Sequence, residues 1–211
     1  MSKNTKDRLL DAAERLCAER SIAGTSIRDI TQAAEANVAA VNFHFGGKQG
    51  LIKALFKRRL EPLAAARLER LADLRTRKGT PTASDILDAF TVPLMEQMAR
   101  PDSNSQAFAR LFARTVIEPT DAITELFGTD MADYTQTYLG ALQKALPHLS
   151  RDEVILRFDF AVGAIAHALS DPSRRKAFDV NVDLETIDST LRAFLIAGLQ
   201  APATMEKSDH E

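Results

Sequence analysis

The chain has 211 residues, with 27 Lys and Arg against 29 Asp and Glu, one Cys and 45% hydrophobic residues. This length allows one large domain or two small ones, and the ordinary globular composition excludes wholesale disorder. Because Cys17 is the only cysteine, a disulfide framework and a multi-cysteine metal site are excluded. Apolar runs stay below the ~18 residues of a membrane span. The first residues also lack a signal-peptide core, so we expect a cytoplasmic protein.

Charge is distributed unevenly along the chain. Residues 1–60 carry 11 Lys and Arg against 6 Asp and Glu, whereas residues 61–211 carry 16 against 23. A basic first part favours a polyanionic partner at one end of the molecule. The alternative is an uneven surface charge without a function.

Apolar residues recur at three- and four-residue steps almost throughout, and no alternation typical of strands appears, which predicts an all-α fold of about nine helices. The first helix carries Leu9, Ala13 and Leu16 on its apolar face and ends near Arg20. The later predicted helices cover about 26–34, 37–45, 48–59, 62–77, 84–98, 108–117, 123–146, 152–169 and 184–200.

Local signals place several helix ends. Ser26 with Asp29, and Ser150 with Glu153, have the spacing of capping boxes. Pro62 suits the first turn of a new helix, where its missing N–H costs nothing. We therefore expect a head of residues 1–59, a larger helical body of residues 60–203, and a frayed polar tail of residues 204–211.

Two short helices packed on a longer first helix have the outline of a helix-turn-helix. Residues 26–34 would form the supporting helix, and residues 37–45, capped by Asn37, would form the recognition helix. In this arrangement the second helix enters the major groove and its first residues meet base edges. Periodicity alone leaves open that the three helices are plain packing.

The head also carries a family pattern. Thr25-Ser26-Ile27-Arg28-Asp29-Ile30 is followed by Ala33-Ala34, then Val41-Asn42-Phe43-His44-Phe45, then Lys48 and Leu51. Over about Asp7 to Phe56, this pattern resembles the DNA-binding head of TetR (tetracycline-repressor-type) transcriptional regulators. The usual core of that family reads roughly T-x-R-D-I-A, A-G-V-S, L-Y-x-H-F and K-E-x-L. Four positions depart from it: Glu35 replaces the turn glycine, Phe43 a tyrosine, Gly47 a Ser or Asn cap, and Gln49 a Glu.

The resemblance, together with side-chain chemistry, implies how the head meets DNA. Arg28 would read guanine, and Asn42 would pair with adenine or a phosphate. Phosphates would be held by Thr25, Ser26, His44 and Lys48, with a cap of the helix end as the alternative role for His44. The full predicted set is Thr25, Ser26, Arg28, Asn37, Val38, Ala39, Ala40, Asn42, Phe43, His44 and Lys48. The core positions would be Ile27, Ile30, Val41, Phe45, Leu51 and Leu55.

For the body, the resemblance implies effector binding and dimerisation. The last two helices of each subunit would pair into a four-helix bundle, although ordinary core packing within one chain is the alternative for their apolar stripes. The predicted dimer residues are Phe158, Val162, Ile165, Leu191, Phe194, Leu195 and Leu199. His167 would lie near this interface.

An effector pocket is expected among the central helices. The predicted ligand-binding residues are Phe90, Leu94, Met98, Leu111, Arg114 and Val116. Phe and Met suit a pocket for varied apolar ligands, and they serve equally well as core. Arg114 would pair with a ligand carboxylate if it pointed inward, because a buried arginine needs a partner. A solvated helix face is the alternative.

The sequence contains no Gly-rich phosphate loop, no HExxH and no nucleophile elbow. We therefore expect no catalytic site, cofactor or metal. The sequence predicts a homodimeric repressor that binds an operator in double-stranded DNA and is released by a small apolar or amphipathic effector. The alternative is a helical interaction protein that kept the head fold without reading DNA.

Overall fold

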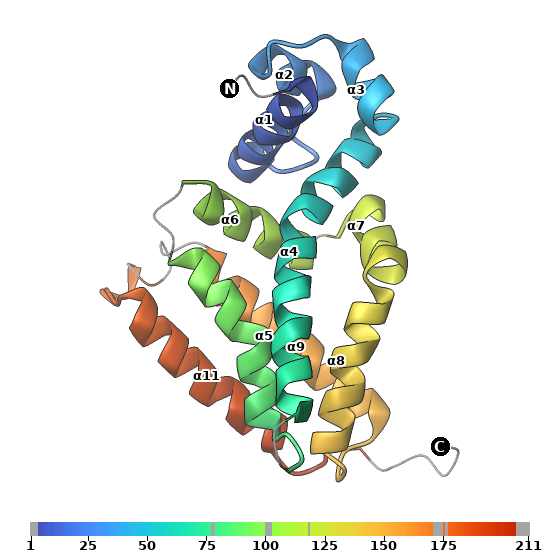
Figure 1. Cartoon of the computed structure of the whole chain (residues 1–211). Coiled ribbons are helices and arrows are strands. Elements are labelled where there is room, and N and C mark those ends of the chain that lie inside the picture. Colours follow the sequence, from blue (N-terminus) through green and yellow to red (C-terminus); the bar gives the residue numbers. More distant parts are fainter. Residues whose placement is uncertain are drawn as a thin grey trace.

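The computed structural model describes residues 4–76, 79–99, 103–117, 119–170, 175 and 177–205. These residues form ten α-helices, one π-helical turn and no strand, which confirms the predicted all-α class. The helices are α1 Thr5–Arg20, α2 Ile27–Ala33, α3 Val38–Phe45, α4 Lys48–Thr76, α5 Ala83–Met98, α6 Ser103–Ile117, α7 Asp121–Glu125, α8 Ala132–Ala145, α9 Arg151–Ser170 and α11 Leu184–Gln200, with the π-helical turn η1 at Leu126–Asp130. Helices α1–α3 form the head, and the others surround α4 below it (Figure 1).

Helix α4 runs without interruption from the head into the body (Figure 1). The predicted break between residues 59 and 62 is wrong, because Pro62 lies inside this 29-residue helix. Leu60 and Leu63 on either side are both buried, so tertiary packing holds the helix together across the proline. The proposed boundary between residues 59 and 60 therefore falls within one rigid element.

The single helix predicted for residues 123–146 is also wrong. The segment divides into α7, η1 and α8, and the Met131 N–H donates to the Leu126 carbonyl over 3.0 Å. The wider turn of this i→i+5 hydrogen bond brings Leu126 and Met131 towards the same buried side, whereas a regular α-helix would rotate one of them away. Phe127, between them, remains partly exposed.

The core of the head continues into the body. Buried residues of α1–α4, including Phe56, pack in one cluster with Phe108 and Leu111 of α6 and Ile123 of α7. The predicted core positions Ile30, Val41, Leu51 and Leu55 are buried, and Ile27 and Phe45 are partly buried against them. Cys17 is a buried thiol of the same cluster. The head is thus fixed to the body by shared apolar packing.

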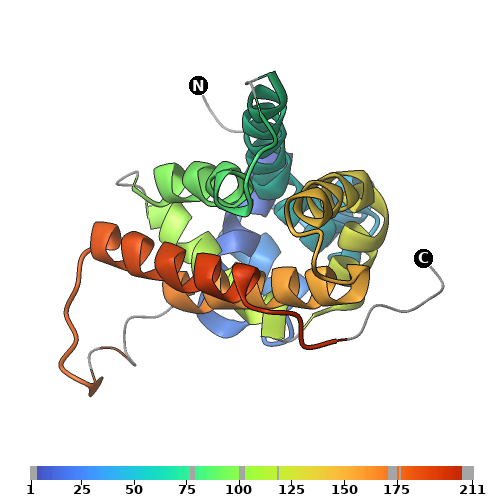
Figure 2. The same ribbon diagram turned by 90° about the horizontal axis from the view of Figure 1, so that it is seen from below.

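In the body, α9 and α11 lie side by side as an outer layer (Figure 2). Their inner faces join a second core cluster with α5 and α8, in which Tyr138 and Leu149 are fully buried.

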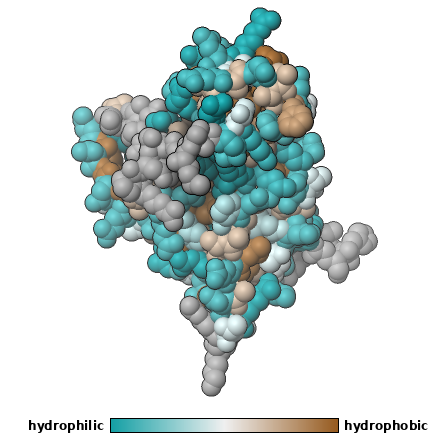
Figure 3. Space-filling model, turned by 45° about the horizontal axis from the view of Figure 1, so that its top comes forward, coloured by the Kyte–Doolittle hydropathy of each residue, from teal (hydrophilic) through white to brown (hydrophobic). Residues whose placement is uncertain are grey.

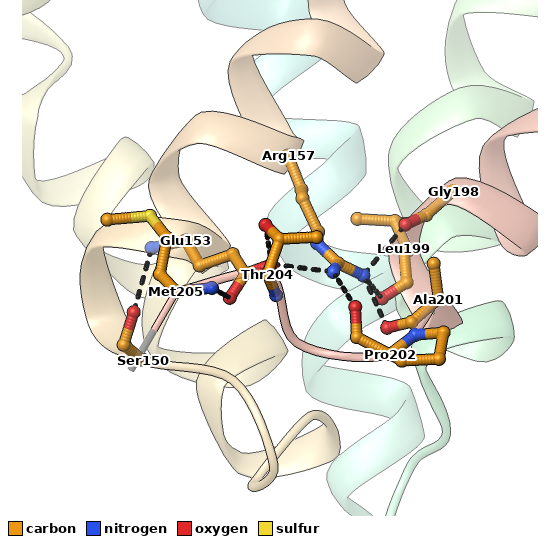
Figure 4. A network of polar contacts seen from close by, with 9 residues as sticks. All are labelled: Ser150, Glu153, Arg157, Gly198, Leu199, Ala201, Pro202, Thr204 and Met205. Carbon is orange, nitrogen blue, oxygen red and sulfur yellow. Dashed lines mark hydrogen bonds and ion pairs between the residues drawn. The ribbon is translucent and has the colours of Figure 1, made fainter. Parts of the chain in front are cut away.

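A network of polar contacts fixes the end of α11 to α9 (Figure 4). Arg157 donates to four carbonyl oxygens, those of Gly198, Leu199, Ala201 and Pro202, over 2.7–3.1 Å. It also pairs with Glu153, whose side chain is almost fully buried. The unsatisfied carbonyls at the helix end thereby gain charged donors.

This network corrects two predictions. Ser150 does accept from the Glu153 N–H over 3.2 Å, but the Glu153 carboxylate does not complete a capping box. Instead it accepts from the N–H and hydroxyl of Thr204 and from the N–H of Met205. The first two residues of the predicted frayed tail are therefore held in place, and residues 206–211 lie outside the described part of the chain.

Candidate nucleic-acid interface and internal cavity

Side-chain caps fix the two short helices of the head. Ser26 caps α2 in a complete capping box with Asp29, as predicted. Asn37 caps α3 and accepts from the Ala40 N–H over 2.8 Å. Such caps satisfy N–H groups that would otherwise lack partners, and each typically contributes about 1 kcal/mol. The two helices therefore meet at a defined angle despite their length.

The turn between α2 and α3 has the geometry that usually calls for glycine. The Ala36 N–H donates to the Thr31 carbonyl and the Glu35 N–H to the Gln32 carbonyl, which together form a Schellman motif. Glu35 occupies its left-handed position, with φ of +48°. The turn is thus kept without glycine, at a conformational cost that a glycine would not carry.

The junction from α3 to α4 depends on close backbone approach. Helix α3 ends at Gly46, which is left-handed with φ of +72°. A Cβ on Gly50 would lie 1.8 Å from the Phe45 carbonyl oxygen, so only glycine fits there. The recognition helix is thereby coupled directly to α4.

Helix α3 presents most of its predicted contact residues to solvent. The exposed ones are Val38, Ala39, Asn42, Phe43 and His44, together with the cap Asn37, and Ala40 is half-buried. Phe43 is 85% exposed and lies edge-on to His44 at 5.0 Å between ring centroids. Figure 3 shows apolar atoms among the hydrophilic ones on this end of the molecule. An exposed aromatic ring and small apolar side chains suit contact with base edges and thymine methyl groups.

The supporting residues divide into two groups. Arg28 and Ser26 are exposed beside α3, as a DNA contact requires. Thr25 is fully buried, and its hydroxyl donates to the Ser21 carbonyl over 2.8 Å. The predicted phosphate contact of the Thr25 side chain is therefore wrong, because packing at the end of α1 has taken it. Lys48 is half-buried and donates to the Ile22 carbonyl over 2.7 Å.

Several cations of the head do not face solvent freely. Arg58 and Arg59 of α4 both pair with Glu14 of α1, which is 3% exposed. Lys53 and Lys57 pair with acidic residues of the body, as described below. Some of the basic side chains in residues 1–60 thus form ion pairs between helices. Fewer of them remain available to contact a polyanion.

The body contains a partly open cavity of about 340 Å³. Its walls come from α4, α5, α6, α7, η1, α8 and α9, and they are mainly apolar. The lining residues are Leu60, Ala64, Arg67, Phe90, Phe112, Thr115, Val116, Pro119, Ile123, Thr124, Phe127, Met131, Tyr134, Thr135, Leu139, Ile155, Phe158, Asp159 and Val162. Its size lies at the lower end of the range for small-molecule sites.

The cavity agrees only partly with the predicted pocket. Phe90 and Val116 line it. Leu111 is buried in the core shared with the head, and Leu94 and Met98 are partly buried outside the lining. Arg114 is exposed and does not line the cavity, which agrees with the alternative of a solvated helix face and not with a ligand-binding role.

The charged group inside the cavity is Arg67 instead. Its side chain is 7% exposed, and its Nε donates to the Phe90 carbonyl over 2.6 Å. One terminal nitrogen donates to the Tyr134 hydroxyl over 3.0 Å, and the guanidinium carbon lies 3.7 Å from the Phe90 ring centroid. Tyr138 in turn donates to the Arg67 carbonyl over 2.8 Å. Burial lowers the pKa of Arg67 and raises the pKa of Tyr134.

Sequence reasoning missed Arg67, although a signal was present. Leu60, Leu63, Leu71 and Leu74 recur at helical steps, and position 67 falls on the same face of α4. A charged residue on an apolar stripe is rarely fully buried without a reason. The prediction ended a helix at residue 59, so residues 60–74 were not recognised as part of one continuous buried face.

The predicted dimer residues also need correction. Four of them are buried within the chain: Ile165, Leu191, Leu195 and Leu199. This agrees with the alternative interpretation of the apolar stripes, core packing within one chain. Phe158 and Val162 line the cavity, and only Phe194 is exposed. The large apolar side chains that α9 and α11 leave exposed are Leu156, Phe160 and Phe194, at 44%, 67% and 67%. His167 is exposed on α9.

Within the described residues, no helix combines the length and apolarity of a membrane span. In the same part of the chain, no group of three or more His, Cys, Asp or Glu side chains is arranged as a metal site.

Two family models match this chain. Residues 9–55 match "Bacterial regulatory proteins, tetR family", and residues 88–198 match "Tetracyclin repressor-like, C-terminal domain". A probable HTH-type transcriptional regulator, YttP of Bacillus subtilis, is 38% identical over 55 residues. That match spans 26% of this chain and 27% of YttP.

Solved structures resemble the whole chain in fold. A tetR-family transcription regulator from Shewanella sp. PV-4 has a TM-score of 0.63 at 17% identity, over 94% of this chain and 97% of that one. The regulator FadR from Bacillus subtilis, solved with stearoyl-CoA, has a TM-score of 0.60 at 17% identity, over 91% and 98%.

Proposed function

Because the chain belongs to the TetR family of bacterial transcription regulators, which bind DNA through a helix-turn-helix, we propose that it is a homodimeric repressor released by a small effector. The effector would be an apolar or amphipathic molecule bound in the cavity of the body. The operator would be a near-palindrome with half-sites about one helical turn, ~34 Å, apart.

One observation carries this proposal. Helix α4 begins three residues after the recognition helix ends, and 12 residues further on it forms a wall of the cavity through Leu60. A shift of α4 would therefore turn α3 relative to the body. An effector changes DNA affinity only if it binds the two arrangements with different affinity.

A second contact joins the cavity wall to α4. Lys53 lies 2.7 Å from both Glu125 and Asp130, and Lys57 lies 3.1 Å from Asp130. Lys53 and Lys57 hold the pKa of Asp130 well below its usual range. The segment that carries these carboxylates also lines the cavity through Phe127. We propose that an effector displaces this segment and thereby alters the ion pairs that hold α4.

Dimerisation would use the exposed apolar side chains of α9 and α11. Leu156, Phe160 and Phe194 lie on the outer layer, where exposed large apolar side chains favour an interface. Arg157 and Glu153 fix the end of α11 beside them. This surface replaces the one expected from the sequence, since most of those residues pack inward.

Operator selection tests the proposal. The purified protein would be incubated with fragmented genomic DNA from its source at about 50 and 150 mM salt, and the retained fragments sequenced. A sharp palindromic motif that persists at the higher salt is expected, because phosphate contacts alone weaken steeply with salt. Broad retention that disappears with salt, or no retention, would favour the interaction-protein alternative.

A further inference from the structure

The cavity holds a buried positive charge without a negative partner among the described residues. The acceptors that Arg67 reaches are a backbone carbonyl and a phenol, at Phe90 and Tyr134. The carboxylate that lines the cavity, Asp159, is solvent-exposed and forms no ion pair with Arg67 in the described part of the chain. A buried charge is costly unless it is paired, so the site is electrostatically incomplete as it stands.

The cavity also offers hydrogen-bond donors that are not used. The second terminal nitrogen of Arg67 has no acceptor among the described residues. The Tyr134 hydroxyl accepts from Arg67, and its own proton has no acceptor there. Because burial raises the pKa of Tyr134, the phenol stays protonated at neutral pH and remains a donor. Two adjacent donors, one of them charged, match the oxygens of an anion.

The remaining wall is largely apolar. Around these donors lie Phe90, Phe112, Leu139 and Phe158, which favour a hydrocarbon or aromatic body. A volume of about 340 Å³ lies at the lower end of the range for small-molecule sites. The cavity therefore suits a small and mostly apolar ligand.

We infer that the effector is an organic acid, with a small apolar body and one carboxylate bound by Arg67 and Tyr134. This inference rests on the proposed function, since it names the chemical class of the effector. The carboxylate supplies the missing negative charge and accepts from both unused donors. A neutral ligand of the same shape leaves the charge unbalanced, and a cationic ligand adds to it.

A matched ligand series tests the inference. Binding of octanoate, 1-octanol and octylammonium to the full-length protein would be measured by calorimetry at pH 7.5. Octanoate should bind roughly 10- to 100-fold more tightly than 1-octanol, since hydrogen bonds to charged groups are the strong ones. Octylammonium should bind most weakly.

Three variants locate the effect. Arg67→Met keeps an unbranched apolar stem without the guanidinium group and should remove the preference for octanoate over 1-octanol. Tyr134→Phe keeps the ring and should weaken octanoate binding about fivefold, as expected for one lost hydrogen bond. Asp159→Asn, the control at the only lining carboxylate of the described residues, should keep or strengthen octanoate binding. If Arg67→Met does not fold, Tyr134→Phe and the ligand series decide the matter.

Equal affinity for octanoate and 1-octanol would overturn the inference. Undiminished octanoate binding by Arg67→Met would do the same, as would the absence of octanoate binding at millimolar concentration. Operator release by 1-octanol without acid preference would leave the proposed function in place and remove the inference. Arg67-dependent octanoate binding without any change in operator affinity would confirm the acid-binding site and remove the proposed release of the operator by its ligand.

Discussion

The candidate functional residues face outward in the head and inward in the body. On α3 the candidate contact residues point outward, and Phe43 is 85% exposed while the core lies behind Val41. In the body the candidate contact residues point inward, and Arg67 is 7% exposed within the wall of a cavity. The exposed side chains of α3 can be substituted without disturbing the packing beneath them. The side chains that line the cavity also belong to the core, so substituting them disturbs its packing.

The comparison also separates two ways of burying charge. Glu14 in the head and Glu153 in the body are buried carboxylates that meet arginines. Arg67 is buried without such a partner among the described residues. Compensated charges fasten elements together, and an uncompensated charge at a cavity is better suited to a ligand.

The largest expected effect comes from Phe56, which joins the two regions. It is fully buried and lies 5.8 Å from the Phe108 ring in the body, between ring centroids. Phe56→Ala should lower the free energy of unfolding by about 3–5 kcal/mol, the usual cost of removing a buried phenyl group. Because the core is shared, denaturant should unfold head and body in one transition, measured by circular dichroism.

Phe43→Ala is the matched control, since it removes the same ring from the surface. It should change stability by less than about 0.5 kcal/mol. Two separate transitions, or similar losses for both variants, would contradict the view that the head depends on the body for its core.

Variants of Arg28 and Lys48 test whether different residues of the head read the base sequence and hold the phosphates. Arg28→Ala should weaken binding to the selected operator by about 1–3 kcal/mol and relax one base position. Lys48→Ala should weaken binding to operator and random DNA alike. The Lys48 ammonium gives one N–H to the Ile22 carbonyl and keeps two for a phosphate, a contact that carries no sequence information. Titrations by fluorescence anisotropy measure both effects.

Arg75→Ala provides the control for lost charge, because Arg75 is exposed near the far end of α4, about 40 Å from Lys48 along the helix axis. It should leave both affinities unchanged. Equal losses on operator and random DNA for the Arg28 and Lys48 variants would refute the division of roles.

Glu153 should make the body sensitive to acid. The pKa of Glu153 is lowered from 4.5 to about 2. The main cause is the hydrogen bond from the Thr204 N–H, followed by those from the Arg157 guanidinium and the Thr204 hydroxyl. A lowered folded pKa means that this stabilisation is fully present above about pH 4.5 and is lost as the pH falls towards 2. Unfolding measured between pH 2 and 5 should show this loss in the native protein. Glu153→Gln should lose less over the same range, whereas Asp152→Asn, an exposed neighbour, should behave like the native protein.

Much of the head could be predicted from its sequence because its signals are local. Ser26 with Asp29, and Asn37, mark helix starts by chemistry that acts over three residues. The apolar spacing of Ile30 and Val41 identifies the buried faces. Thr25 was the exception, because only the position of the Ser21 carbonyl decides whether its hydroxyl meets DNA or the fold.

The body was harder because its site depends on distant segments. Pro62 is a strong local signal for a helix start, yet packing of Leu60 and Leu63 overrides it. The stripe with Leu191 and Leu195 fits a core and an interface equally well, since periodicity shows that a face is buried and not what covers it. The identity of the charged cavity residue could not be predicted without the neighbours of Arg67, which come from α5 and α8.

The smallest expected effect concerns the turn that orients α3. Glu35→Gly should raise the free energy of unfolding by about 0.5–1 kcal/mol, because glycine adopts φ of +48° without the steric cost of a Cβ. The gain is limited by the greater chain entropy of glycine in the unfolded state. Operator affinity should stay within about twofold, since the Schellman hydrogen bonds involve only backbone atoms. Gln32→Gly, three residues earlier and inside α2, should instead destabilise the protein by about 1 kcal/mol. A loss of stability in Glu35→Gly would mean that the glutamate side chain contributes to the turn. In that case even the outer surface of the head would carry part of the fold, and the contrast with the body would weaken.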